Sequence, residues 1–195
     1  EPAFYRKFEM EVQYFGHPLL DEIERFHQQE QTRLALPTSK PILAILPGSR
    51  KQELRKKLPL MLTAAKAFQE THQIVIAGAP NLPASFYQEF QLDENVTLIQ
   101  NQTYPLLSQA ELALVTSGTA TLETALFAVP EVVCYKGNEI SYQIAKRLIN
   151  IKYISLVNLI MDQEVVKELI QHEMILALYT VLLCSPNTTT IYNLY

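Results

Sequence analysis

A six-residue segment at 41–46, Pro-Ile-Leu-Ala-Ile-Leu, restricts the fold more than any other part of this chain. It is an almost unbroken apolar run, which is typical of strands in parallel sheets because helices cover both faces of such strands. The run ends at Pro-Gly-Ser-Arg at 47–50. Gly48 permits a sharp turn, Ser49 can cap a following helix, and the Arg50 guanidinium is a permanently charged fork suited to phosphate. The segment therefore predicts a buried parallel strand that leads into an anion-binding turn.

A second strand, turn and helix are predicted from residues 112–115, Leu-Ala-Leu-Val, and the residues that follow. Gly118 lets the backbone come close to a ligand. The hydroxyls of Ser117 and Thr119 and the free amides of a helix N-terminus would then face an anion. Glu123 comes one turn into that helix, where its carboxylate can accept hydrogen bonds from a sugar diol. Short motifs have low specificity, so a capped helix with a surface glutamate remains the alternative interpretation.

Apolar runs alternate with helical patterns along the rest of the chain. Strands are predicted at 12–15, 41–46, 74–77, 96–99, 112–115, 131–135 and 153–156. Helices are predicted at about 19–30, from Pro59 onward, at 84–90, 104–109, from 119 to a stop at Pro130, and at 140–149, 163–171 and 173–184. This order is typical of a doubly wound α/β domain with a parallel sheet. Ligands of such domains bind at the carboxyl ends of strands near the topological switch point, so the two glycine turns and Asn158 are predicted to form one site.

The composition limits the class of protein. The 195 residues suffice for one large domain, or one domain with appendages, and 48% of them are hydrophobic. A net charge of −4 argues against a broad nucleic-acid-binding surface. The two cysteines, Cys134 and Cys184, lie in apolar surroundings and are predicted to be buried thiols rather than a disulfide or a metal site.

The predicted organisation is a connector at 1–17, a domain at 18–184 and a tail at 185–195. No secretory signal pattern occurs, and no apolar run approaches the roughly 18 residues of a membrane-spanning helix. The basic segment at 51–57 is interpreted as a solvated helix face. His17 is interpreted as a hydrogen-bonded structural residue rather than a hinge or ligand contact. The chain begins without an initiator methionine, so we expect it to be part of a longer protein.

Seven motifs follow one another along the chain. They are Gly-His-Pro-Leu at 16–19, Leu-Pro-Gly-Ser-Arg at 46–50, Ser-Gly-Thr-Ala-Thr-Leu-Glu at 117–123, Tyr-Lys at 135–136, Ile-Ala-Lys-Arg-Leu at 144–148, Tyr-Ile-Ser-Leu-Val-Asn-Leu-Ile at 153–160 and Glu-Leu-Ile-Gln at 168–171. In this combination and order they closely resemble bacterial lipid-A-disaccharide synthases. The resemblance runs from the first residues to about residue 173 and covers the C-terminal half of that family's usual length.

The resemblance implies a GT-B glycosyltransferase with two Rossmann-like domains, of which this chain is the C-terminal one that binds the donor. The family transfers 2,3-diacylglucosamine from UDP to 2,3-diacylglucosamine 1-phosphate, inverts the anomeric centre and releases UDP. It implies no cofactor and no metal. It also implies a peripheral protein on the cytoplasmic face of the inner membrane, with a membrane surface and a second copy of the chain as partners, and no nucleic acid.

Roles for individual residues follow from the same resemblance. Arg50 would contact the UDP diphosphate and stabilise the charge of the leaving group, and Glu123 would accept hydrogen bonds from the ribose hydroxyls. The remaining residues of the implied UDP site are Gly48, Ser49, Ser117, Gly118, Thr119, Asn158, Glu168 and Gln171. The general base belongs to the family's N-terminal half, so no residue here is given that role and the chain alone is expected to be inactive.

Two other readings stay open. Another GT-B enzyme, such as the peptidoglycan N-acetylglucosaminyltransferase or a UDP-N-acetylglucosamine 2-epimerase, shares the same type of donor site, but its signature around the acidic residue is not found here. A non-catalytic nucleotide-binding or interaction module is the alternative from a different class.

Overall fold

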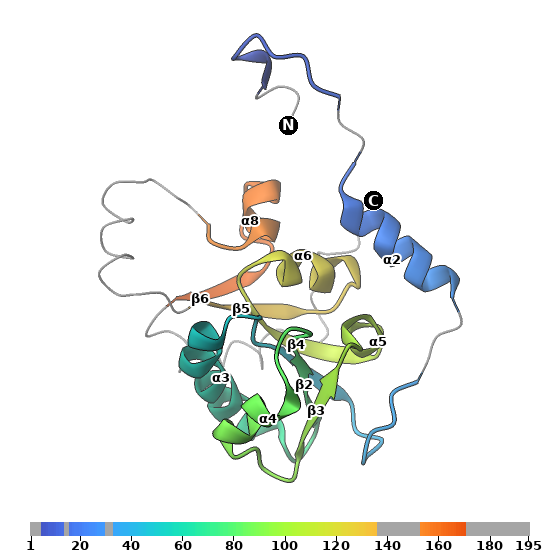
Figure 1. Cartoon of the computed structure of the whole chain (residues 1–195), viewed down its shortest axis with the longest axis vertical. Coiled ribbons are helices and arrows are strands. Elements are labelled where there is room, and N and C mark those ends of the chain that lie inside the picture. Colours follow the sequence, from blue (N-terminus) through green and yellow to red (C-terminus); the bar gives the residue numbers. More distant parts are fainter. Residues whose placement is uncertain (1–4, 14–15, 30–32, 136–152, 171–195) are drawn as a thin grey trace. The chain divides into compact units, whose positions relative to one another are not determined.

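The chain divides into two compact units, Glu1–Gln31 and Thr32–Tyr195 (Figure 1). The structure, a computed structural model, describes residues 5–13, 16–29, 33–135 and 153–170. The division comes after Gln31, whereas the sequence predicts the domain from residue 18. The described part of the first unit contains helix α2, Pro18–Gln28. His17 caps this helix by accepting a hydrogen bond from the Leu19 amide on Nδ1 at 3.2 Å, which agrees with the structural role predicted for it.

The second unit is built on a parallel sheet of six strands in the order β3-β2-β1-β4-β5-β6 (Figure 1). The strands are β1 Ile42–Leu46, β2 Gln73–Gly78, β3 Val96–Gln100, β4 Ala110–Thr116, β5 Glu131–Tyr135 and β6 Lys167–Ile170. The chain runs outward from β1 to β3 and then returns to the other side of β1 for β4. The switch point therefore lies between β1 and β4, and the order is that of the doubly wound Rossmann fold. The predicted fold class, a Rossmann-like doubly wound parallel sheet, is confirmed.

Helices cover both faces of this sheet (Figure 1). They are α3 Lys51–Ala65, η1 Lys66–Phe68, α4 Ala84–Tyr87, η2 Gln88–Phe90, α5 Thr103–Leu107, α6 Thr119–Leu126 and α8 Leu156–Met161. Successive side chains of β1 point to opposite faces. Leu43 and Ile45 join a buried cluster with α3 and α4, while Ile42, Ala44 and Leu46 join a second cluster with α5. Burial on both sides explains why this strand is apolar throughout.

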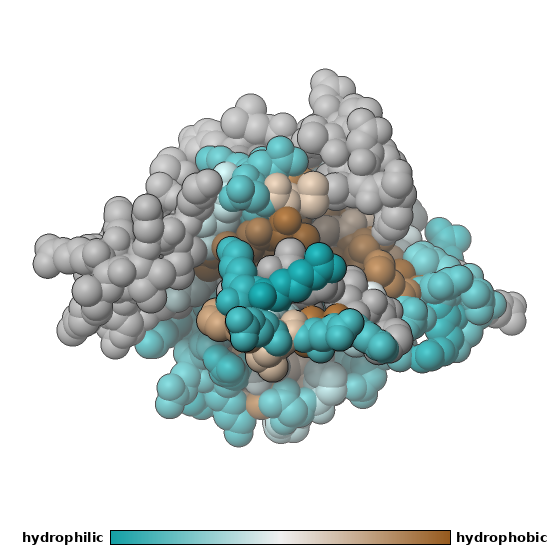
Figure 2. Space-filling model, turned by 90° about the horizontal axis from the view of Figure 1, so that it is seen from above, coloured by the Kyte–Doolittle hydropathy of each residue, from teal (hydrophilic) through white to brown (hydrophobic). Residues whose placement is uncertain are grey.

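The exposed side chains of the described residues are mainly polar on the face drawn in Figure 2. Figure 2 draws one face of the molecule, on which the described residues are mostly hydrophilic and the hydrophobic ones gather in a smaller area. A third, smaller hydrophobic cluster lies beside β5. In it, Val133 of β5 packs with Leu122 of α6, with Val157 of α8 and with Val166, which precedes β6. The end of the sheet with β4, β5 and β6 is thus covered by α6 and α8.

Helix α3 differs from the prediction. The sequence predicts a helix from Pro59, but α3 begins at Lys51 and Pro59 lies inside it. A proline within a helix removes one backbone hydrogen bond and crowds the preceding turn. Leu54 and Leu58, which are fully buried on the same helix, keep the segment on the sheet despite that cost. The interpretation of 51–57 as a solvated face is wrong for Lys57, which is buried.

The last two described elements also differ. The sequence predicts a strand at 153–156, but residues 153–155 form no strand and helix α8 begins at Leu156. The Ser155 hydroxyl caps this helix by accepting a hydrogen bond from the Asn158 amide at 3.2 Å. The helix predicted at 163–171 is wrong as well, because β6 pairs in parallel with β5 in this segment. Glutamate, lysine and leucine favour a helix only weakly, and pairing with a neighbouring strand overrides that preference.

Several predictions fall partly or wholly outside the described residues. Of the strand predicted at 12–15, residues 12 and 13 form no strand, and the other two lie outside. The helices predicted at 140–149 and 173–184, the tail and Cys184 also lie outside. Cys134 is 1% exposed in β5, so the prediction of a buried thiol is confirmed at that position.

Candidate functional site

A cavity of about 730 Å³ lies at the carboxyl ends of β1, β2 and β4. Its volume is within the range of small-molecule binding sites. It brings together seven of the predicted site residues, Gly48, Ser49, Arg50, Ser117, Gly118, Thr119 and Glu123. We call it the switch-point pocket, because it spans the two strands between which the strand order reverses. Both glycine turns line this one pocket, as predicted, whereas Asn158, which was predicted to join them, does not line it.

The turn after β1 depends on Gly48. Its φ of +94° lies in the region that favours glycine, and a Cβ placed there would lie 3.0 Å from the Cγ2 atom of Thr116. The glycine therefore allows both the turn and the close approach of β1 to β4. The turn leads directly into α3, whose N-cap is Arg50 and whose first turn has no side-chain cap. Amides at the start of an uncapped helix are suited to an anion.

The turn after β4 has the same design. Gly118 is the N-cap of α6 with a φ of +151°, and no side chain caps the helix. A Cβ placed on Gly118 would meet no atom within 4 Å, so the space in front of this backbone is open. The Ser117 hydroxyl donates to the Ile154 carbonyl at 3.0 Å. Its proton is thus engaged by the protein, and the amides and Thr119 remain the local donors for a ligand.

Glu123 lies one turn into α6 and lines the same pocket. Its Oε1 accepts a hydrogen bond of 3.4 Å from the Tyr104 hydroxyl. Burial raises the pKa of this carboxyl, and the hydrogen bond from Tyr104 opposes part of that rise. The tyrosine ring packs against Phe127, with the ring centroids 5.3 Å apart. A carboxylate held in this way can accept hydrogen bonds from a diol.

Three charged side chains, Arg50, Glu53 and Lys57, form a row that runs from the rim of the pocket into the core, and the sequence did not predict this row. We call these three residues the charge chain. The side chains of Arg50, Glu53 and Lys57 are 82%, 37% and 4% exposed. Glu53 accepts from Arg50 Nη1 at 3.0 Å and from Lys57 Nζ at 3.3 Å. Lys57 Nζ also donates to Thr116 Oγ1 at 2.6 Å, and it lies 5.7 Å from the centroid of the Tyr135 ring. Glu53, Thr116 and Tyr104 line the pocket beside the predicted residues.

One signal for Lys57 was present in the sequence. It lies three residues after Leu54 and four before Met61, on the face of α3 that carries the buried apolar side chains. A lysine at such a spacing is expected to have a partner inside the fold. Burial raises the pKa of the Glu53 carboxyl, but Lys57 and Arg50 outweigh that effect and the pKa is lowered.

Asn158 and Glu168 occupy a different place from the one implied for them. Neither lines the switch-point pocket. The Asn158 side chain accepts from the amides of Val165 and Val166 at 2.7 and 2.9 Å and donates to Glu168 at 2.8 Å. Glu168 also accepts from the amides of residues 154 and 155, each at 2.8 Å. This network holds the segment before α8 to β6, and the segment in turn accepts the hydrogen bond from Ser117. Gln171 lies outside the described residues.

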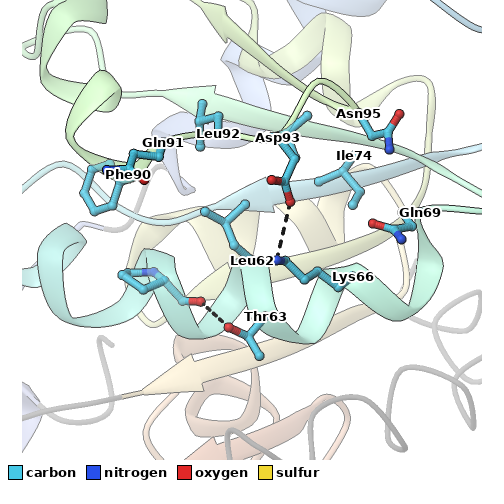
Figure 3. Close-up of a pocket in the computed structure, with 12 residues that line it drawn as sticks. Leu62, Thr63, Lys66, Gln69, Ile74, Phe90, Gln91, Leu92, Asp93 and Asn95 are labelled. Carbon is cyan, nitrogen blue, oxygen red and sulfur yellow. Dashed lines mark hydrogen bonds and ion pairs between the residues drawn. The ribbon is translucent and has the colours of Figure 1, made fainter.

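A second, smaller cavity of about 180 Å³ lies between α3, strand β2 and the segment that leads into β3 (Figure 3). It is lined by Leu62, Ile74, Phe90 and Leu92, and Lys66 pairs with Asp93 at 3.5 Å across it. It contains none of the predicted site residues. Within the described residues, no group of three or more histidine, cysteine, aspartate or glutamate side chains could hold a metal ion. The described helices include none with the length and apolar character needed to cross a bilayer.

Comparison with known proteins connects this geometry to a family. The family model for lipid-A-disaccharide synthetase matches residues 1–185. The lipid-A-disaccharide synthase of Syntrophus aciditrophicus is 37% identical over 180 residues, which cover 88% of this chain and 47% of the relative. The enzyme of the same name from Psychromonas ingrahamii is 36% identical over 181 residues, again 88% of this chain and 48% of the relative. The chain thus spans about half the length of the curated relatives it matches.

A likeness to a solved structure is much weaker. The glycosyltransferase SnogD from Streptomyces nogalater is 15% identical, over 93% of this chain and 46% of that chain, with a TM-score of 0.42. At that score the likeness adds nothing to the sequence match. The match of the family model over nearly the whole chain, with relatives above 30% identity, is decisive. The chain belongs to the lipid-A-disaccharide synthetase family.

Proposed function

We propose that this chain is the donor-binding half of a GT-B glycosyltransferase that makes the lipid A disaccharide. The reaction transfers 2,3-diacylglucosamine from UDP to 2,3-diacylglucosamine 1-phosphate, with inversion and release of UDP. The observation that carries the proposal is the switch-point pocket, in which two glycine turns, two uncapped helix N-termini and Arg50 converge. Together they present positive potential and amide donors to one ligand, which suits a nucleoside diphosphate.

The pocket has groups for the diphosphate and for the ribose of UDP. The Arg50 guanidinium and the amides at the starts of α3 and α6 bind the diphosphate. They stabilise the negative charge that develops on it as the sugar leaves, and fixed donors of this kind lower the barrier because they need no reorganisation. Glu123, held by Tyr104, accepts hydrogen bonds from the ribose diol. Asn158 and Glu168 act indirectly, by holding the segment that Ser117 contacts.

We assign the remaining functions to the part of the relatives' length that this chain does not span. The general base, the acceptor site and the acyl-chain contacts belong there, as does the surface that places the protein on the cytoplasmic face of the inner membrane. The full-length protein forms a homodimer. This chain alone binds UDP but does not catalyse the transfer reaction. Disaccharide produced by this chain alone would refute this assignment of functions to the two halves.

Titration calorimetry with UDP tests the proposal, with ADP as the control ligand. UDP should bind and ADP should bind far more weakly. Arg50→Ala should weaken UDP binding by about 10- to 100-fold, the loss expected for a charge-assisted hydrogen bond. Glu123→Ala should lower the preference for UDP over uracil nucleotides that lack the ribose diol.

The matched control is Arg55→Ala. Arg55 lies on the same helix and is also exposed, but it is bonded to Glu89 at 2.9 Å and does not line the pocket. This variant should bind UDP as the parent chain does. If neither this chain nor the full-length protein binds UDP, the turns are structural and the proposal is wrong.

A further inference from the structure

The charge chain behind Arg50 has a feature that the proposed function does not use. A carboxylate, Glu53, lines a pocket proposed for a diphosphate. Like charges juxtaposed at a binding site disfavour binding. The structure contains the group that offsets this effect, because Glu53 lies 3.3 Å from the buried ammonium of Lys57.

We infer that Lys57 is a positioning residue of the donor pocket, which neutralises Glu53 so that this carboxylate can hold Arg50 without repelling the diphosphate. The inference rests on the proposed function and deepens it. Glu53 is the link, since it accepts from Arg50 at 3.0 Å and from Lys57 on its other oxygen. The arrangement leaves one net positive charge at the rim, carried by the exposed guanidinium.

The position of Lys57 is fixed from several sides. Its ammonium donates to Thr116 Oγ1 at 2.6 Å, and the Thr116 methyl is the group that would meet a Cβ at Gly48. The ring of Tyr135 lies 5.7 Å from the same nitrogen. An exposed lysine would have many rotamers, whereas this one is 4% exposed and has little freedom. A cation held in this way keeps a fixed distance from Glu53, and water screens a buried ammonium less than an exposed one.

The other groups near Glu53 support its ionised state. Burial raises the pKa of Glu53, but Lys57 and Arg50 outweigh burial and the pKa is lowered. Removing Lys57 leaves Arg50 as the remaining cationic partner of the Glu53 carboxyl among the described residues. Glu53 and the diphosphate would then compete for the Arg50 guanidinium. The negative charge of Glu53, no longer neutralised by Lys57, would also repel the diphosphate.

UDP titration of four variants tests the inference. Lys57→Met keeps the aliphatic bulk and removes the charge, so it should weaken UDP binding by at least about tenfold. Glu53→Gln/Lys57→Met removes both charges, and it should bind UDP within about threefold of the parent chain. Lys57→Arg keeps the charge and should retain most of the affinity. Lys56→Met, which removes an exposed charge from the next position of the same helix, should have no effect.

Binding per folded molecule, with the folded fraction of each variant measured by circular dichroism, decides between a positioning role and a purely structural one. If Lys57 only supports the fold, folded Lys57→Met will bind UDP as tightly as the parent chain, and the inference is wrong. If Lys57→Met does not fold, the double variant still tests the inference, because it buries no unpaired charge and a loss of UDP binding in it would contradict the neutralising role. If the parent chain binds UDP and Lys57→Met binds it with the same affinity, this inference is wrong but the proposed function stands. No UDP binding by the parent chain or the full-length protein would overturn the proposed function and this inference with it.

Discussion

Glu131 provides a direct test of how burial controls the stability of this fold. It is the first residue of β5 and is 4% exposed. Neither carboxylate oxygen has a hydrogen-bond partner among the described residues. Burial raises the pKa of this carboxyl well above its ordinary value of 4.5. The folded chain therefore retains a proton that the unfolded chain releases once the pH exceeds about 4.5.

The sign and size of the effect follow from proton linkage. The native state binds more protons than the unfolded state above pH 4.5, so the free energy of unfolding falls as the pH rises. The slope is about 1.4 kcal/mol per pH unit, and it continues until the folded carboxyl itself ionises. Glu131→Gln has nearly the same shape and no charge, so it does not have this slope. The variant should exceed the parent chain in stability by about 1.4 kcal/mol for each pH unit in this range.

Urea denaturation followed by circular dichroism, at intervals between about pH 5 and pH 8, measures both free energies of unfolding. Glu70→Gln is the control, since that carboxylate is exposed. Its difference from the parent chain should stay flat with pH. If the difference in free energy of unfolding between Glu131→Gln and the parent chain also stays flat with pH, then a partner stabilises the ionised carboxylate in the folded chain. That result would refute the reasoning.

Three further outcomes are expected. Asn158→Ala should lower the free energy of unfolding by about 2–4 kcal/mol in urea denaturation, because it leaves two amides and a carbonyl of the β6 segment unpaired; a loss below about 1 kcal/mol would contradict the network. Gly118→Ala has space for its methyl but an unfavourable φ, so it should cost about 1–3 kcal/mol and weaken UDP binding; an unchanged melting temperature and affinity would count against it. Burial, opposed by Lys57, raises the pKa of the Cys134 thiol to about 12, so iodoacetamide at about pH 8 should spare it in the native chain; mass spectrometry showing alkylation at the rate of the urea-unfolded chain would contradict this.

The strands were predictable to the extent that burial imposes a local pattern. Strands β1, β2, β4 and β5 contain buried apolar runs because helices cover both of their faces. Strand β3 is only partly buried, and its apolar run is interrupted by Thr97. Strand β6 differs most. Its residues, Lys-Glu-Leu-Ile, have no apolar run, and they form a strand only because β5 offers a partner. Pairing across the sheet is a tertiary effect that no local window contains.

The site divides in the same way. Gly48 and Gly118 were predictable because a turn and a helix start are local features of the chain. The connection of Lys57 to Thr116 depends on how α3 lies against β4, and local sequence does not contain that distance. Asn158 is the reverse case, because the sequence predicts a ligand contact and the structure shows contacts with the backbone. A polar residue beside a predicted site can serve a ligand or its own backbone, and here its side chain serves the backbone.

The strand order also has a consequence for folding. The two glycine turns belong to β1 and β4, which pair side by side although β2 and β3 come between them in the chain. The pairing of β1 with β4 must therefore close a long loop, which costs chain entropy. The pocket thus depends on contacts between residues that are far apart in the sequence. A partly folded chain with only β1, β2 and β3 in place has half of a pocket. A nucleotide that needs both halves binds the completed sheet alone, and at a hundred times its dissociation constant it would stabilise that state by about 2.7 kcal/mol.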